Sequence, residues 1–140
     1  MTEIHSYLLC DGNCAAAMAT YHRLLGGTLE QLLVKDSPMA AHMPPAHLEK
    51  VLNAKLSAPG FTIMASDWLA PQPFQAMQGS RLYLNLDDHA EAERIFHALS
   101  DGGHVTEAFK ATFWAEGFGS LEDKFGTRWM VAVQRKGQNA

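Results

Sequence analysis

The sequence lacks the features that mark several large classes of protein. It has only two cysteines among 140 residues, Cys10 and Cys14, so it offers no disulfide framework to interpret. No apolar run approaches the length of a membrane-spanning helix, and the first residues lack the basic and apolar regions of a secretory signal. We therefore expect a cytoplasmic protein with no membrane partner, in which the two cysteines are buried free thiols.

An excess of positive charge is also missing. The 11 Lys and Arg residues are outnumbered by 15 Asp and Glu, which gives a formal net charge of -4 at pH 7. The basic residues are scattered along the chain, so nucleic acid is not an expected partner. Apolar residues are plentiful at 47%, which is enough to bury the core of one ordinary globular domain.

Local patterns in the first half predict a strand, a helix and then further strands. The apolar run from Ile4 to Cys10 suits a buried strand, and an Asp-Gly-Asn break separates it from an Ala-rich helix from Cys14 to Leu25. Asn13 is the expected N-cap of this helix. Further strands are expected at Leu29–Val34, Lys50–Leu56 and Phe61–Ser66, with a proline-containing loop from Asp36 to His47.

The densest local signal is a hairpin near the end of the chain. Gly117 to Glu122 leads into an Asp-Lys-Phe-Gly turn in which Gly126 takes a left-handed conformation, and Thr127 to Gln134 alternates as a half-buried strand. Trp129 lies on this strand, where core packing and a place on a pocket wall are both open. Trp114 precedes two glycines outside a regular strand, which suits a side chain presented to a cavity.

The two halves of the sequence repeat one another. At an offset of 76 residues, segment 7–27 matches segment 83–103, and the helix pattern recurs at Ala90–Leu99. We therefore predict one domain over residues 1–140, made of two modules, about 1–78 and about 79–140. The identical pairs are Tyr7 and Tyr83, Leu8 and Leu84, Asp11 and Asp87, Ala16 and Ala92, Gly26 and Gly102, and Gly27 and Gly103.

Short motifs along the chain, taken with the repeat, resemble a known family. They are Asp11-Gly12-Asn13-Cys14, Met43-Pro44-Pro45, Met64-Ala65-Ser66-Asp67, Phe113-Trp114, and Asp123-Lys124-Phe125-Gly126 with Trp129-Met130. They are similar to the PhnB-like branch of the glyoxalase, bleomycin resistance and dioxygenase (vicinal oxygen chelate) superfamily. The resemblance implies an α+β fold in which two tandem βαβββ modules form a concave mixed β-sheet. It also implies a homodimer.

That branch has carried a demethylubiquinone methyltransferase label as well. The sequence has no Gly-rich turn between a strand and a helix that suits a nucleotide-like methyl donor. We therefore discount methyl transfer.

Enzymes of the wider superfamily hold a divalent metal with His and Glu side chains from four strand positions. The resemblance places these positions at Ser6, Met64, Arg81 or Leu82, and Met130. Two thioethers and an arginine do not form a ligand set for a hard cation or for zinc. We therefore expect no bound metal and no cofactor.

These features leave three functions open. We favour a metal-independent protein that binds a small, partly apolar molecule on the concave face, with Trp114 and Trp129 as walls. Arg81 would be the counter-ion of an anionic group, although a surface arginine needs no partner. Ser66 and Asp67 could orient a polar part of the same ligand. The alternatives are a metal-dependent lyase or dioxygenase, and a dimeric interaction module with no open pocket; the sequence decides neither the ligand nor whether catalysis occurs.

Overall fold

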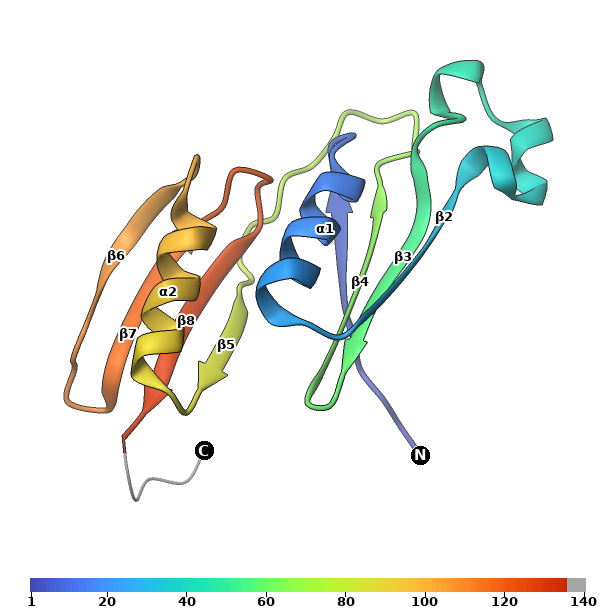
Figure 1. The fold of residues 1–140 in the computed structure, drawn as a ribbon. Coiled ribbons are helices and arrows are strands. Elements are labelled where there is room, and N and C mark those ends of the chain that lie inside the picture. The colour runs from blue at the N-terminus through green and yellow to red at the C-terminus, as the bar shows by residue number, and fades with distance from the viewer. Residues whose placement is uncertain (136–140) are drawn as a thin grey trace. The chain divides into compact units, whose positions relative to one another are not determined.

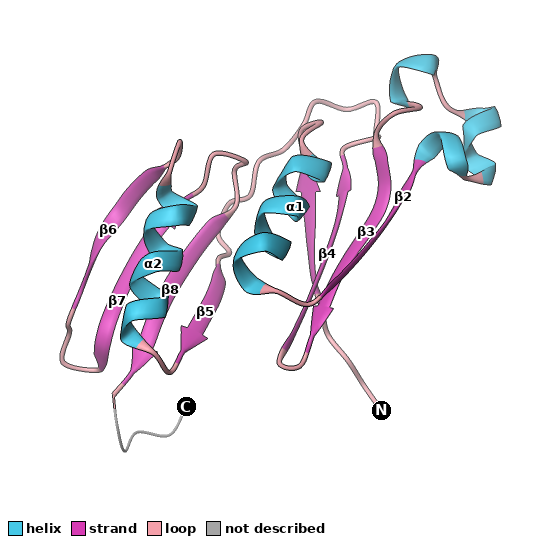
Figure 2. Cartoon of the chain, viewed as in Figure 1, coloured by secondary structure: helices cyan, strands magenta, loops and turns pink. Residues whose placement is uncertain are grey.

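The computed structural model describes residues 1–135 and divides into two compact units, Met1–Ala76 and Met77–Ala140 (Figure 1). In each unit a strand and a helix precede three further strands (Figure 2). The first unit consists of β1 (Ser6–Cys10), α1 (Cys14–Leu25), β2 (Thr28–Leu33), β3 (Val51–Ala58) and β4 (Phe61–Asp67). The second consists of β5 (Leu82–Leu86), α2 (His89–Ser100), β6 (His104–Lys110), β7 (Ala115–Glu122) and β8 (Arg128–Gln134).

The two units have the same sheet topology. The strand order is β1-β4-β3-β2 in the first sheet and β5-β8-β7-β6 in the second. In each, the first strand lies parallel to the last, and the remaining neighbours are antiparallel. This confirms the predicted α+β fold of two βαβββ modules, and it rules out a parallel sheet wound by helical crossovers.

Each helix packs its apolar side on one face of its own sheet. The helical spacing of Ala92, Ile95 and Leu99 gives α2 a buried stripe, as expected for an amphipathic helix. The sheet residues in these cores alternate along their strands. The core of the first unit contains Leu8, Cys10, Cys14, Ala17, Met18, Tyr21, Leu56 and Ala65; that of the second contains Phe96, Leu121, Trp129, Val131 and Val133.

Two separate physical reasons explain why a pair of glycines follows the helix in each unit. Gly26 and Gly102 follow the helices with the same φ of +78°, a left-handed conformation that glycine adopts without strain. Gly27 and Gly103 lie tight against the next strand pair. A Cβ built on Gly27 would meet Ser57 O at 2.7 Å, and one on Gly103 would meet Glu122 O at 2.2 Å. Gly27 also has a positive φ of +93°, whereas Gly103 has none, so only the close approach of the backbone explains Gly103.

Two stretches differ from the prediction. The loop expected from Asp36 to His47 contains short 3-10 turns, at Val34–Asp36, Pro38–His42 and Pro45–His47. The last two begin with proline, which is favoured at the first positions of such turns. The strand β6 was not predicted individually. It lies at the edge of its sheet with nearly all of its residues exposed, so its sequence carries little apolar alternation.

None of the helices within residues 1–135 is both long and apolar enough to cross a membrane.

Candidate functional site

The second sheet has an outer face, defined here as the face that points away from α2. A Cβ built on Gly119 would meet the Phe96 ring of α2 at 2.6 Å, so this position of β7 faces the helix. Side chains alternate along a strand, and therefore Phe118 and Ser120 point outward. Residues directly opposite on β8 share that face. The outer face thus contains the cross-strand pairs Phe118 with Ala132, Ser120 with Met130, and Glu122 with Arg128.

An open pocket of about 550 Å³ lies at one end of the outer face. It is lined by Gly79, Ser80, Arg81, Arg128 and Met130. The parallel pairing of β5 with β8, which sets Leu82 beside Trp129, carries Arg81 to this place. Two arginines therefore line the same pocket.

Sequence reasoning named Arg81 but missed Arg128 and Met130 as lining residues. The signal for both was present. Arg128 stands two residues before Met130 on an alternating strand, so the two side chains had to share a face.

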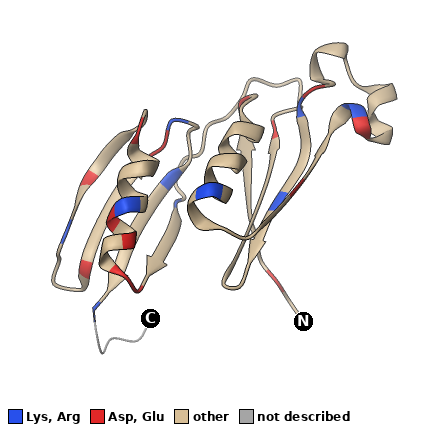
Figure 3. Ribbon diagram, viewed as in Figure 1, with Lys and Arg blue, Asp and Glu red and all other residues tan. Residues whose placement is uncertain are grey.

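One carboxylate lies beside this pair of cations. Glu122 Oε1 is 3.3 Å from Arg128 Nε, and Glu122 Oε2 is 3.8 Å from His104 Nε2. Arg128 Nε is buried and makes no hydrogen bond of good geometry, so the Glu122 contact is an ion pair only. Glu122 offsets one of the two positive charges, so the pocket wall retains a net positive charge. Figure 3 colours the basic and acidic residues along the ribbon.

The outer face becomes apolar beyond the arginines. Met130 packs against a buried cluster of Ala115, Phe118 and Ala132. The Trp114 ring stands edge-on to Phe118, with 5.4 Å between ring centroids, and remains 41% exposed. Apolar packing therefore joins the arginine end of this face to the exposed Trp114, but the residues between them, Phe118 and Ala132, are buried.

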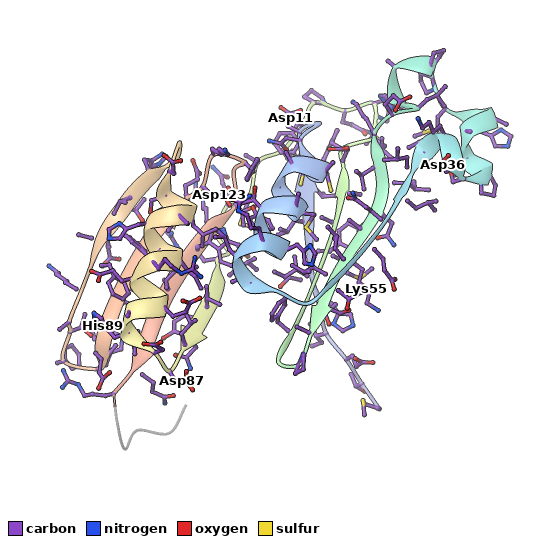
Figure 4. The ribbon with its side chains drawn as sticks, viewed as in Figure 1. Asp11, Asp36, Lys55, Asp87, His89 and Asp123 are labelled. Atoms are coloured by element: carbon purple, nitrogen blue, oxygen red, sulfur yellow. The ribbon has the colours of Figure 1, made fainter. Side chains whose placement is uncertain are left out.

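Trp129, the other predicted wall residue, lies in the core of the second unit. Its side chain is 2% exposed, and its indole nitrogen donates a hydrogen bond of 2.9 Å to Asp123 Oδ2. Asp123 Oδ1 also accepts bonds from the amides of Phe125 and Thr127, at 2.9 Å each. Figure 4 labels Asp123 in the turn that joins β7 to β8. The structure thus favours the core-packing role of Trp129 over the pocket-wall role.

Ser66 and Asp67 are buried in the first unit, with 7% and 3% of their surfaces exposed. Asp67 Oδ1 accepts a hydrogen bond from Cys14 N at 3.0 Å, and Oδ2 accepts one from Val51 N at 2.8 Å. Its carboxylate therefore joins the end of β4 to the starts of α1 and β3.

Asn13 is the N-cap residue of α1, as predicted, but its side chain makes no capping bond. The first amide of the helix, Cys14 N, is bonded by Asp67 instead. In the second unit the N-cap of α2 does use its side chain, since Asp88 Oδ1 accepts a bond of 3.1 Å from Ala90 N.

The register shows what lies beside two of the positions that the resemblance assigns to metal ligands. Met64 pairs with Tyr7, and Met130 pairs with Tyr83. Ser6 lies one residue away and alternates with Tyr7, on the side of the buried Leu8. A phenol beside a thioether does not fit a divalent metal of the superfamily type. In the described chain, His, Cys, Asp and Glu residues form no group of three or more that could hold a metal ion.

Comparisons with known proteins agree with this fold. The family model of 3-demethylubiquinone-9 3-methyltransferase matches residues 2–132. Protein YjdN of Escherichia coli (strain K12) is 32% identical over 93% of this chain and 94% of its own length. The crystal structure of protein PA1353 from Pseudomonas aeruginosa is 41% identical, with a TM-score of 0.88 over 96% of this chain and 98% of that one.

A more distant structure shares the fold alone. A glyoxylase, bleomycin resistance protein and dioxygenase domain from Frankia sp. EAN1pec superposes with a TM-score of 0.62 at 11% identity, over 99% of this chain and 96% of that one. The chain therefore belongs to the 3-demethylubiquinone-9 3-methyltransferase family, its PhnB-like branch, with the fold of the glyoxalase, bleomycin resistance and dioxygenase proteins.

Proposed function

We propose that this protein binds a small anionic molecule with an apolar part, without a metal, on the outer face of the second sheet. The observation that carries the proposal is the presence of Arg81, Arg128 and Met130 in one pocket. A guanidinium group offers a planar pair of donors that fits a carboxylate or a phosphonate. The anionic group of the ligand lies between the arginines, and its apolar part lies along Met130.

The lining of the pocket limits the ligand. Arg128 and Ala132 are four residues apart on β8, which corresponds to roughly 13 Å of strand. Ala132 and Phe118 are buried, so a ligand in the pocket lies no further along β8 than Met130. One aromatic or short aliphatic part fits this space, and Trp114, which packs on Phe118 at the far end, is not among the residues that line the pocket.

The other functions have less support. A lyase or dioxygenase of this superfamily needs a metal, and the Tyr-Met pairs are poor ligands for one. Methyl transfer, which the family description names, has little support from the turn after β1. That turn is Asp-Gly-Asn, and the Cys14 amide behind it is engaged by Asp67.

The binding proposal predicts a specific loss of affinity. Phenylphosphonate and benzoate are expected to raise the melting temperature, by an amount that corresponds to about 2.7 kcal/mol at 100 times the dissociation constant. Neutral benzamide is expected to have no effect. Arg81→Gln should weaken phenylphosphonate binding roughly ten-fold to a hundred-fold, because it removes about 1.5–3 kcal/mol of charge-assisted bonding. Isothermal titration calorimetry measures the affinity of the parent and of Arg81→Gln for phenylphosphonate.

Arg94→Gln is the matched control, since Arg94 is an exposed arginine of the same unit that pairs with Glu91 on α2. It should bind phenylphosphonate as the parent does. Equal affinities for the parent, Arg81→Gln and Arg128→Gln, all folded, would contradict the pocket assignment. Elemental analysis of the purified parent is the second control, and about one transition metal per chain would contradict metal independence.

We also propose a homodimer. The end strands β2 and β6 carry exposed apolar side chains, Leu32 at 41% and Val105 at 45%. Sheet edges of this kind need a cover to avoid uncontrolled pairing. Sedimentation equilibrium at micromolar concentration should give twice the chain mass of 15.4 kDa. A single species at the chain mass would exclude the dimer.

A further inference from the structure

The first unit holds two free cysteines side by side in its core. Cys10 is the last residue of β1 and Cys14 is the first residue of α1, with three residues of turn between them. They are 3% and 0% exposed, and both are reduced. They are the only cysteines in the chain.

Asp67 lies next to both cysteines. Cys10 pairs with Asp67 in the parallel register of β1 and β4, and the Cys14 amide donates to Asp67 Oδ1 at 3.0 Å. A disulfide needs two cysteines whose backbones lie close together and whose side chains share one region. Both side chains are buried in the same core, and both residues adjoin Asp67.

We propose that Cys10 and Cys14 form an intramolecular disulfide in the folded protein when hydrogen peroxide reaches them. Cys10 reacts first, since it retains slight exposure whereas Cys14 has none. The Cys10 thiolate attacks one peroxide oxygen, the O–O bond breaks, and the leaving hydroxide takes a proton to become water. Cys10 is thereby oxidised to a sulfenic acid.

The second step joins the two sulfurs. Cys14 releases its proton and its thiolate attacks the Cys10 sulfur, the S–O bond breaks, and the departing hydroxide takes up a proton to leave as water. The net change converts two thiols and one peroxide into one disulfide and two waters. Because the product is uncharged, it can remain in the core beside the Asp67 carboxylate.

The charge environment sets the pH dependence of this reaction. The hydrogen bond with Cys10, the burial of the thiol and the negative charges of Cys10 and Asp67 together raise the pKa of Cys14. The attacking form of Cys14 is its thiolate, so closure of the disulfide is slow at neutral pH. The rate of disulfide closure should still rise with pH above about 8.5. The rate for a thiol of ordinary pKa begins to level off there, because most of that thiol is already ionised.

Intact mass spectrometry tests the proposal on the whole protein. The reduced protein is exposed to hydrogen peroxide, treated with catalase, then denatured and alkylated with N-ethylmaleimide. The expected product has lost two hydrogen atoms, takes up no maleimide, runs as a monomer on a non-reducing gel, and regains both thiols with dithiothreitol. Two maleimide adducts, a stable sulfinic acid or a cross-linked dimer would each overturn the proposal.

Two single variants test the order of the steps. In Cys14→Ser, the Cys10 sulfenic acid has no thiol to attack it, so dimedone should label Cys10. In Cys10→Ser, dimedone should leave Cys14 unlabelled. Labelling of Cys14 instead would overturn the assigned order. The mass measurement on the parent protein still decides the disulfide if a variant does not fold.

Discussion

Replacing Gly103 with alanine is expected to lower the free energy of unfolding by about 3 kcal/mol or more. The added Cβ would lie 2.2 Å from Glu122 O and 2.8 Å from Asp123 C, both of them backbone atoms. Neither can move without breaking the pairing of His104 with Glu122 where β6 begins. Urea unfolding, with the slope m compared between proteins, measures the loss.

The preceding glycine provides the control for this prediction. Gly102 has a φ of +78°, and a Cβ there would meet the Lys124 side chain at 3.1 Å, which is free to shift. Gly102→Ala should therefore cost only about 1–2 kcal/mol of backbone strain. If Gly103→Ala were as stable as Gly102→Ala, the steric explanation of the second glycine would be wrong.

Asp123→Ala is expected to destabilise the protein by about 3–5 kcal/mol. The carboxylate is 5% exposed and accepts from two backbone amides and from the Trp129 indole. Its removal takes the acceptor from two buried donors and one partly buried donor, and it opens a cavity under the hairpin turn. The melting temperature should fall, and near-ultraviolet circular dichroism of the tryptophans should change even in the folded variant.

Two further variants test whether the hydrogen bonds of the Asp123 carboxylate account for this loss of stability. Asp123→Asn keeps one acceptor oxygen for the turn amides and should lose about half as much stability. Asp11→Ala removes an exposed aspartate and should change stability by less than about 0.5 kcal/mol. Equal stability of Asp123→Ala and Asp11→Ala would show that the buried carboxylate contributes nothing.

The sequence predicted the fold well because local patterns and the internal repeat agreed with one another. Tyr7 and Tyr83, which the repeat matches, occupy equivalent places in the two units. Tyr7 pairs with Met64 on β4, and Tyr83 pairs with Met130 on β8. The Asp-Lys-Phe-Gly turn formed as expected, with φ of +96° at Gly126. Such features depend on neighbouring residues, so they can be read from a single chain.

What the sequence could not reveal depended on residues far apart in the chain. The Asp67 bond to Cys14 spans 53 positions, and no local rule would prefer it to a cap by Asn13. The pocket is similar, since Arg81 meets Arg128 only through the parallel pairing of β5 with β8. The role of Trp129 also needed the structure, because an alternating strand does not show which of its faces is covered.

The two buried aspartates differ in how far along the chain their partners lie. Asp123 binds groups only two, four and six residues away, so the hairpin turn can close soon after its own residues collapse. Asp67 binds groups 16 and 53 residues away, and those bonds wait until nearly the whole first unit has been synthesised. In a chain emerging from the ribosome, the Cys14 amide at the start of α1 therefore lacks its bond to Asp67 until β4 has been synthesised.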